Sequence, residues 1–179
     1  MIVKQLDIPD ILLIKPSLYE DDRGFFYEFF NQKKFNLQTG LDISFVQDNI
    51  SYSKKGVLRG LHFQVSPMQQ GKLVSVISGK VIDVVVDIRE NSKTYGKYIK
   101  ETLSCENKKM LWIPQGFAHG FYTLSENTIF LYKTTNFYSK EHEKILIWND
   151  KSLNIDWGIK GNPIISYKDK NGLSFNGKN

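Results

Sequence analysis

"KLVSVISGKVIDVVVDIR", residues 72–89, is the part of the chain that indicates the fold most clearly. It contains two runs rich in valine and isoleucine, which favour β-strands, and a turn-like Ser78-Gly79-Lys80 between them. In the second run the even positions from 82 to 88 are all Ile or Val and form one apolar face. The odd positions include Asp83 and Asp87, for which contact with solvent is the commoner state and a place beside a cavity the alternative. We expect a hairpin centred on the glycine.

The same period of two recurs along most of the chain, and helical patterning is confined to 31–38 and a single turn near 151–154. The expected strands are 11–15, 25–30, 44–52, 57–64, 72–78, 80–89, 98–104, 110–113, 117–124, 128–136 and 145–148. Many short strands with frequent turn signals predict an all-β antiparallel sandwich or barrel. No linker or break in composition divides the sequence, so we expect one domain over residues 1–179.

Composition limits the classes of partner. The formal net charge is +5, but the lysines are scattered and no nucleic-acid-binding motif is present, so we expect no nucleic acid as partner. Cys105 is the single cysteine, which excludes an intrachain disulfide. The first residues are interrupted by charges, and no apolar run approaches the roughly 20 residues of a membrane span. We therefore expect a cytoplasmic protein with no membrane partner. The mild basic bias suits a small phosphorylated substrate.

"VLRGLHFQ", residues 57–64, places scarce residue types on one strand, because the chain has only three arginines and three histidines. In a regular strand His62 shares a face with Leu58, whereas Arg59 points to the other face. Gly60 lies between the two, and a glycine at this position can host a β-bulge that re-aims one of them. Strand parity alone leaves open whether Arg59 and His62 face one pocket.

A metal site is the first chemistry to test, because two histidines on an all-β protein resemble the metal-binding cupins. Those proteins usually present His-x-His and a nearby Glu on one hairpin. Here the matching stretch reads His62-Phe63-Gln64, and positions 65–71 contain neither acid nor histidine. With His119 as the second histidine, the donor set is poor for a transition metal, so we expect none.

Six segments, in this order, resemble the dTDP-4-dehydrorhamnose 3,5-epimerase family over about residues 10–170: "DDRGFFYE", "FVQDNIS", "GVLRGLHFQ", "QGKLVSVISGKVIDVVVDIR", "IPQGFAHGF" and "WNDKSLNIDW". The resemblance implies a cupin-type jelly roll that forms a homodimer and uses no metal or organic cofactor. It also implies the reaction, which inverts C3 and C5 of a dTDP-linked 4-keto-6-deoxyhexose.

Such a reaction requires particular residue types. The C4 ketone acidifies the hydrogens on C3 and C5, because removal of either gives a resonance-stabilised enolate. A neutral imidazole can accept that proton near pH 7, and an acid on the opposite face must return it. Cationic or hydrogen-bonding groups must stabilise the enolate oxygen.

The resemblance assigns these roles to residues. His62 is the base, Asp169 the carboxylate that orients it, Tyr132 the acid, and Lys72 the group near the C4 oxygen. Phe25, Phe26 and Tyr27 would offer a stacking face for the thymine. The positions that match nucleotide-sugar contacts are Arg23, Glu28, Gln47, Asn49, Arg59, His119, Glu143 and Lys168.

Three alternatives stay open at the level of sequence. The first is an epimerase that inverts only C3 or only C5 of a related nucleotide deoxysugar. The second is a sugar-nucleotide-binding cupin without catalytic activity, and the third is a metal-dependent cupin oxygenase. The intact pair of His62 and Tyr132 favours an epimerase.

Overall fold

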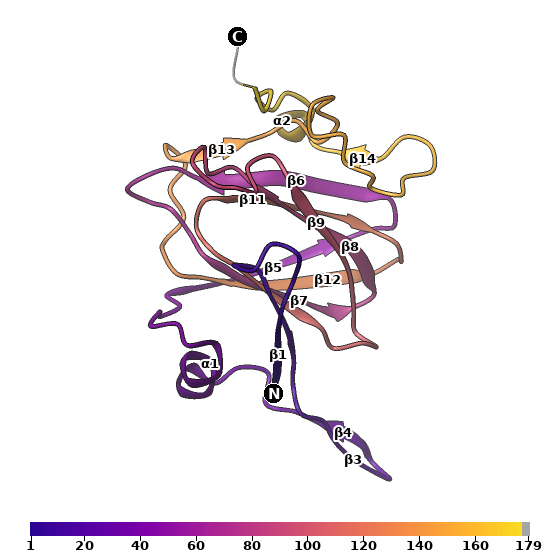
Figure 1. The fold of residues 1–179 in the computed structure, drawn as a ribbon. Coiled ribbons are helices and arrows are strands. Elements are labelled where there is room, and N and C mark those ends of the chain that lie inside the picture. Colours follow the sequence, from indigo (N-terminus) through magenta and orange to yellow (C-terminus); the bar gives the residue numbers. More distant parts are fainter. Residues whose placement is uncertain (177–179) are drawn as a thin grey trace.

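A computed structural model describes residues 1–176, and residues 177–179 of the expected domain lie outside the described part. Most strands belong to two sheets that face each other as a sandwich (Figure 1). The first sheet has the order β1-β2-β10-β7-β12-β5, and the second has the order β13-β6-β11-β8-β9. Their pairings are antiparallel, whereas the short β14 joins β6 in parallel. The fold is the all-β, cupin-type jelly roll that the sequence predicts.

The elements have the following bounds. The first sheet comprises β1 (Ile2–Gln5), β2 (Leu12–Lys15), β10 (Met110–Ile113), β7 (Lys72–Ser78), β12 (Thr128–Thr134) and β5 (Gln47–Ser53). The second comprises β13 (Glu143–Ile145), β6 (Val57–Gln64), β11 (Phe117–Thr123), β8 (Lys80–Asp87) and β9 (Tyr98–Ser104), with β14 (Ile164–Ile165) beside β6. The remaining elements are the hairpin of β3 (Tyr19–Asp21) and β4 (Gly24–Phe26) and the helices α1 (Gln32–Thr39) and α2 (Tyr167–Lys170).

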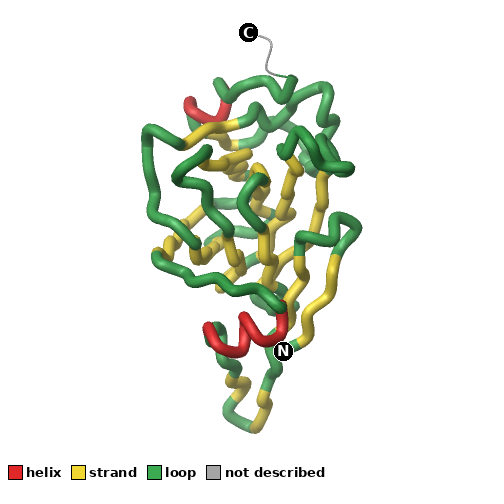
Figure 2. The backbone as a smooth tube through the Cα atoms, turned by 60° about the vertical axis from the view of Figure 1, so that its left-hand side comes forward, coloured by secondary structure: helices red, strands yellow, loops and turns green. Residues whose placement is uncertain are grey.

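Apolar side chains fill three layers. The central layer lies between the sheets, where Phe121 of β11 stacks on Phe130 of β12 with ring centroids 4.2 Å apart. The outer face of the second sheet is covered by the chain after β13, including Trp157. The outer face of the first sheet is covered by α1 through Phe35 and by Phe45. Helix α1 lies at the end of the molecule from which the β3–β4 hairpin projects (Figure 2).

Three sequence expectations were wrong. Gly79 does not join a hairpin, because β7 and β8 belong to different sheets and the turn passes between them. Asp83 and Asp87 are fully buried, because both faces of β8 are covered by protein. Residues 27–30 form no strand.

Local sequence explains the helical elements. Asn31 caps α1, its side chain accepting a hydrogen bond from the Lys34 N–H at 3.0 Å, and Gly40 ends the helix with φ of +72°. The predicted range 31–38 is therefore displaced by one residue. The single turn expected near 151–154 is present as turns without a helix, and the four-residue α2 was not predicted.

Candidate active site

A bulge in β6 places Arg59 and His62 on the same face of the second sheet. His62 pairs with His119 and Arg59 pairs with Phe121, so three steps along β6 match two steps along β11. Residues two apart share a face, and cross-strand partners point to the same side. Gly60 permits this arrangement, because its φ is +120° and a Cβ would lie 2.5 Å from the Gly120 Cα.

The His62 imidazole forms a short pair with a carboxylate from the end of the chain's described part. Its Nε2 lies 2.6 Å from Asp169 Oδ1, and Asp169 is almost fully buried. Burial raises the pKa of Asp169, but the hydrogen bond and charge of His62 outweigh it and leave the pKa below its usual value. An ionised carboxylate in this position fixes the orientation of the ring and stabilises its protonated form.

The segment 166–175, which we call the Asp169 segment, is attached to the sandwich at two points. Leu173 donates its N–H to the Ile145 carbonyl at 2.7 Å and accepts from the Ile147 N–H at 2.8 Å. Asp150 Oδ2 accepts from the Phe175 N–H at 2.9 Å and from the Ser174 hydroxyl at 3.1 Å. These contacts position Asp169 behind His62.

Glu143, on β13 beside β6, links several predicted site residues. One of its oxygens lies 3.6 Å from His62 Nδ1, and the other accepts from the Tyr138 hydroxyl at 2.9 Å and from Lys168 Nζ. Burial raises the pKa of Glu143. The hydrogen bonds from Lys168 and Tyr138 and the charge of His62 outweigh this effect and leave the pKa below its usual value. Glu143 is therefore a partly buried anion at the edge of the His62 pair.

Lys72 begins β7 and is buried on the inner face of the first sheet. Its Nζ donates to the His62 carbonyl oxygen at 3.1 Å, which brings an ammonium group across the sandwich to the base. Burial lowers the pKa of Lys72 to about 8, while the negative charges of Asp83 and Glu143 act in the opposite direction. With this pKa the side chain is mostly protonated at neutral pH, and it loses its proton about one pH unit higher.

Tyr132 is on β12, the strand next to β7, and its side chain packs against the central layer. Burial raises the pKa of its hydroxyl, as does the charge of Glu143, while Arg59 acts in the opposite direction. Its cross-strand neighbour is Asn49 of β5, which accepts from the Gln47 side chain at 2.9 Å. A protonated phenol from the first sheet thus faces the His62 side of the second.

His119 and Asp83 form a second histidine–carboxylate pair between the sheets. His119 Nε2 lies 2.9 Å from Asp83 Oδ2, and both side chains are buried. Arg59 is more exposed, and its guanidinium donates to Ser53 Oγ and to the Tyr52 carbonyl, both at 3.1 Å. The arrangement thus combines an imidazole paired with a carboxylate, a phenol on the facing sheet, and an ammonium group bonded to the backbone of His62.

The matching family model is that of dTDP-4-dehydrorhamnose 3,5-epimerase, over residues 5–177. The chain is 54% identical over 175 residues to a Shigella flexneri protein of that name, which covers 98% of this chain and 96% of that protein. The chain belongs to the dTDP-4-dehydrorhamnose 3,5-epimerase family.

Solved structures agree with this family assignment. The dTDP-4-dehydrorhamnose 3,5-epimerase from Elizabethkingia anophelis superposes with a TM-score of 0.94 at 50% identity, covering 100% of this chain and 98% of its own. A dTDP-6-deoxy-D-glucose-3,5-epimerase from Legionella pneumophila, solved in complex with dTDP-4-keto-L-rhamnose, gives a TM-score of 0.94 at 47% identity, with coverages of 97% and 92%.

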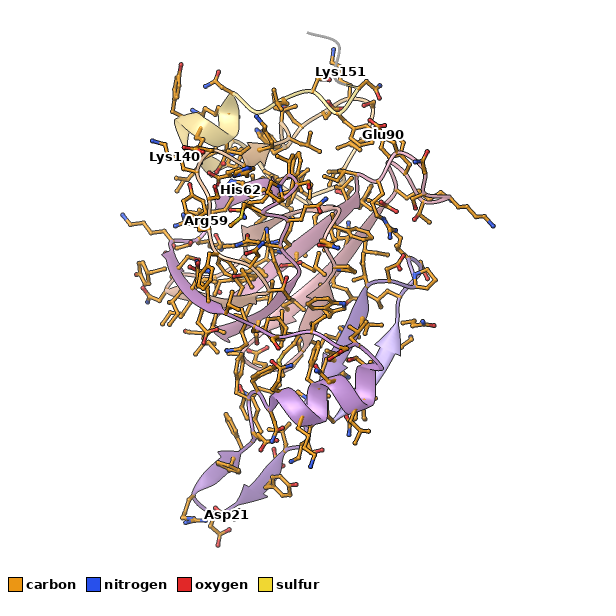
Figure 3. The ribbon with its side chains drawn as sticks, turned by 90° about the vertical axis from the view of Figure 1, so that its left-hand side faces the viewer. Asp21, Arg59, His62, Glu90, Lys140 and Lys151 are labelled. Carbon is orange, nitrogen blue, oxygen red and sulfur yellow. The ribbon has the colours of Figure 1, made fainter. Side chains whose placement is uncertain are left out.

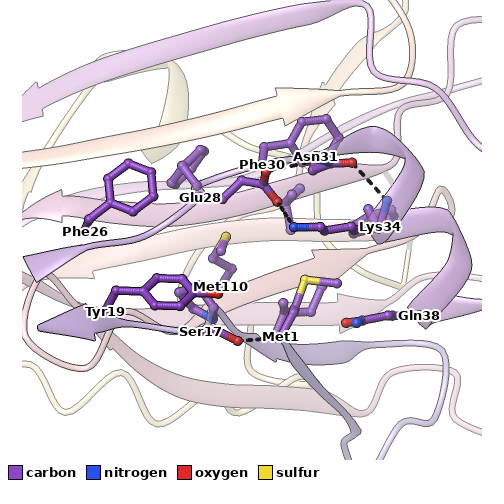
Figure 4. Close-up of a pocket in the computed structure, with 15 residues that line it drawn as sticks. Met1, Ser17, Tyr19, Phe26, Glu28, Phe30, Asn31, Lys34, Gln38 and Met110 are labelled. Atoms are coloured by element: carbon purple, nitrogen blue, oxygen red, sulfur yellow. Dashed lines mark hydrogen bonds and ion pairs between the residues drawn. The ribbon is translucent and has the colours of Figure 1, made fainter.

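Within this epimerase-family chain, most predicted site residues lie around the two facing sheets, but Arg23 and Glu28 do not. Arg23 is in the turn of the β3–β4 hairpin and pairs with Asp21, which lies at the opposite end of the molecule from His62 (Figure 3). Glu28 lines a cavity of about 600 Å³ beside α1, where it pairs with Lys34 at 2.9 Å (Figure 4). The aromatic residues 25–27 lie in or directly after the same hairpin.

Two further residues of the cluster lacked a sequence signal. Tyr138 follows β12 in an irregular stretch, where no strand period indicates which way its hydroxyl points. Asp83 was considered as an acid beside a cavity, but surface exposure was preferred because most such acids are surface residues. Its partner His119 lies 36 residues further along the chain, so no local pattern links the two. Residues 1–176 contain no group of three or more His, Cys, Asp or Glu side chains arranged to hold a metal ion. Among the same residues, no helix has the length and apolar character needed to cross a membrane.

Proposed function

We propose that the protein converts dTDP-4-dehydro-6-deoxyglucose into dTDP-4-dehydro-L-rhamnose by inverting C3 and C5. The observation that carries this proposal is the pairing of His62 with Asp169 on one sheet, opposite the buried phenol of Tyr132 on the other. A base and an acid on facing sheets suit the removal of a proton from one side of a sugar ring and its return from the other. Membership of the epimerase family supports the same reaction.

The proposed steps use each group once for each stereocentre. His62 removes the hydrogen from the carbon beside the C4 ketone, and Asp169 stabilises the imidazolium that forms. The electron pair moves onto the C4 oxygen, where the ammonium of Lys72 stabilises the enolate. Tyr132 then gives its proton to the opposite face of the same carbon, and solvent exchange restores both groups. Arg59 suits the diphosphate, because a guanidinium donates forked hydrogen bonds to phosphate oxygens.

Deuterium exchange separates the roles of base and acid. In heavy water the wild-type protein should label both C3 and C5 of the product, whereas a single-centre epimerase labels one position and a binding protein none. His62→Asn should abolish exchange and inversion, losing about 10² to 10⁴ in rate. Tyr132→Phe should still wash substrate hydrogen into solvent while inverted product nearly disappears.

Tyr95→Phe is the matched control for the tyrosine variant. Tyr95 stacks on Phe175 with ring centroids 4.8 Å apart and is not part of the cluster around His62. Its variant should epimerise at the wild-type rate. Normal inversion by Tyr132→Phe, together with deuterium exchange by His62→Asn, would contradict the two-sided mechanism.

We also propose that the protein works as a homodimer, in which the β3–β4 hairpin of one protomer contributes Arg23, and the stretch directly after it contributes Glu28, to the partner's site. Within one protomer the hairpin projects away from His62 and exposes large aromatic side chains, with Tyr19 66% and Phe26 69% exposed. Exposed apolar surface of this kind is typical of an interaction site. Family resemblance assigns both residues to substrate contacts, which fits delivery to a second copy.

Mixing two inactive variants tests this arrangement. His62→Asn and the double variant Arg23→Ala/Glu28→Ala should each be inactive or strongly impaired. After unfolding and refolding together in equal amounts, about one quarter of wild-type activity should return, because half the dimers are mixed and each carries one intact site. No recovery in demonstrated mixed dimers, or a monomeric mass in light scattering, would contradict the proposal.

We place the protein in the cytoplasm, as one domain over residues 1–179, with no metal or organic cofactor and no nucleic-acid or membrane partner. The single cysteine supports the location, because a reducing compartment keeps thiols free. Enolate chemistry at a ketone needs only a base, an acid and a cation, which the cluster around His62 supplies. Cell fractionation and metal analysis of the purified protein test these statements.

A further inference from the structure

Asp83 is a fully buried carboxylate that the proposed steps leave without a role. It lies on the inner face of β8, in the layer that also contains Val85, Phe121 and Phe130. Oδ2 accepts from His119 Nε2 at 2.9 Å, whereas Oδ1 is buried and has no hydrogen-bond partner among residues 1–176. A buried charge with one unused oxygen is costly to stability, so its presence calls for a specific reason.

Lys72 is the one lysine or arginine among residues 1–176 that is buried. Its only hydrogen bond among the described residues goes to the His62 carbonyl oxygen, at 3.1 Å, so two of its N–H groups remain available. The charge of Asp83 acts on Lys72 more strongly than that of Glu143 does. The other ionisable side chains of β6, β11 and β12 that share the face turned toward this layer are Arg59 and His62 of β6, His119 of β11 and Tyr132 of β12.

We propose that Asp83 is a positioning residue of the epimerase site, which orients the ring of His119 and holds the positive charge of Lys72. This inference rests on the proposed function. By accepting the Nε2 hydrogen bond, Asp83 leaves Nδ1 of His119 for the substrate; no residue among 1–176 forms a hydrogen bond with that atom. By its charge, it keeps the Lys72 ammonium ready for the enolate oxygen at no cost in reorganisation when the oxygen becomes negative.

The pH dependence of the rate distinguishes this role from a purely structural one. Asp83→Asn keeps the shape of the side chain and removes its charge, so Lys72 should lose its proton at lower pH. The pH at which kcat falls on the alkaline side should then be lower by about one unit in the variant. At pH values above this fall, the variant should be slower than the wild type by a further factor on the order of ten. A profile that overlays the wild type would overturn the proposal.

Asp87→Asn is the matched control. Asp87 is on the same face of β8 and equally buried, but its carboxylate binds Arg89, Ser92 and Thr94. Its loss should lower the midpoint of unfolding in urea and leave the kcat–pH profile of the folded enzyme unshifted. An equal shift in both variants would mean that any buried charge on β8 produces the effect, which contradicts a specific role for Asp83.

A measurement on the wild-type protein covers the case in which Asp83→Asn does not fold. With ¹⁵N-labelled histidine, which gives signals from only three residues, His119 should carry its proton on Nε2, and His119→Gln assigns the signal. An unprotonated Nε2 at neutral pH would overturn the proposal. This reading does not depend on activity. If the wild type exchanges no hydrogen of the sugar, the proposed function fails; if it exchanges and Asp83→Asn matches it at every pH, only the role of Asp83 fails.

Discussion

Lys72→Met should make the protein more stable and remove most of its activity. The pKa of Lys72 is about 8 in the folded chain, against an ordinary value of 10.5. A difference of this size means that burying the charged side chain lowers the free energy of unfolding by about 3 kcal/mol. Methionine has a similar length and no charge, so it avoids this cost. It also loses the hydrogen bond to the His62 carbonyl, which contributes about 1 kcal/mol. We therefore expect a gain of about 2 kcal/mol in the free energy of unfolding at pH 7.

The gain has a defined pH dependence. Below pH 8 the lysine is protonated in both folded and unfolded chains, so the full difference between wild type and variant is present. Between about pH 8 and 10.5 the unfolded wild-type chain still binds a proton that the folded one has released, so wild-type stability rises relative to the variant. The difference should therefore shrink as pH increases through this window.

Urea unfolding at fixed protein concentration, repeated from pH 6 to pH 10.5, measures both effects, and the rate of epimerisation should fall by about 10² or more because the enolate loses its cation. Lys97→Met is the control, since Lys97 is exposed and its substitution should change stability by less than about 0.5 kcal/mol. A less stable Lys72→Met at pH 7, or a difference that does not shrink above pH 8, would refute the reasoning.

Three further changes have expected outcomes. Gly60→Ala should cost about 3 kcal/mol or more or prevent folding, because a Cβ would meet the Gly120 Cα at 2.5 Å on backbone with φ of +120°; soluble yield and urea unfolding measure this. Burial raises the pKa of Asp150, but hydrogen bonds from Ser152 and Phe175 lower it to about 2, so Asp150→Asn should cost about 2 kcal/mol above pH 4. That cost should vanish as the pH falls towards 2, as acid titrations of both proteins would show. Exhaustive chelation should leave epimerisation unchanged, and activity that is lost and then restored by one added metal would contradict this.

Strand positions were predictable where the chain alternates and is bounded by turns. The expected strands 57–64, 72–78, 98–104 and 110–113 coincide with β6, β7, β9 and β10. Their pairing was not predictable in the same way. Whether the turn at Gly79 closes a hairpin or crosses to the other sheet depends on β10, β11 and β12, which come later in the chain.

The site was predictable in its residue types more than in its geometry. In a regular strand Arg59 and His62 would point to opposite faces of the sheet. Only the bulge opposite Gly120 places both on one face, so their common orientation depends on a strand about 60 residues away in sequence. Asp169 lies on a helix of four residues with no periodic signal, and family resemblance alone indicated it. Asp83 was expected to be exposed because most acids on such strands are surface residues, and local pattern cannot show that the first sheet covers this face of β8.

The position of the Asp169 segment in the chain means that His62 is synthesised long before the carboxylate that pairs with it. His62 precedes Asp169 by 107 residues, and every strand of both sheets leaves the ribosome before the carboxylate that orients the base. A chain that stops after β14, or one clipped between residues 165 and 169, retains the strands of the sandwich yet lacks the partner of His62. On the proposed mechanism, truncated copies would still compete for substrate, and in the proposed homodimer for partners, but they would lack the carboxylate that helps His62 to remove a proton.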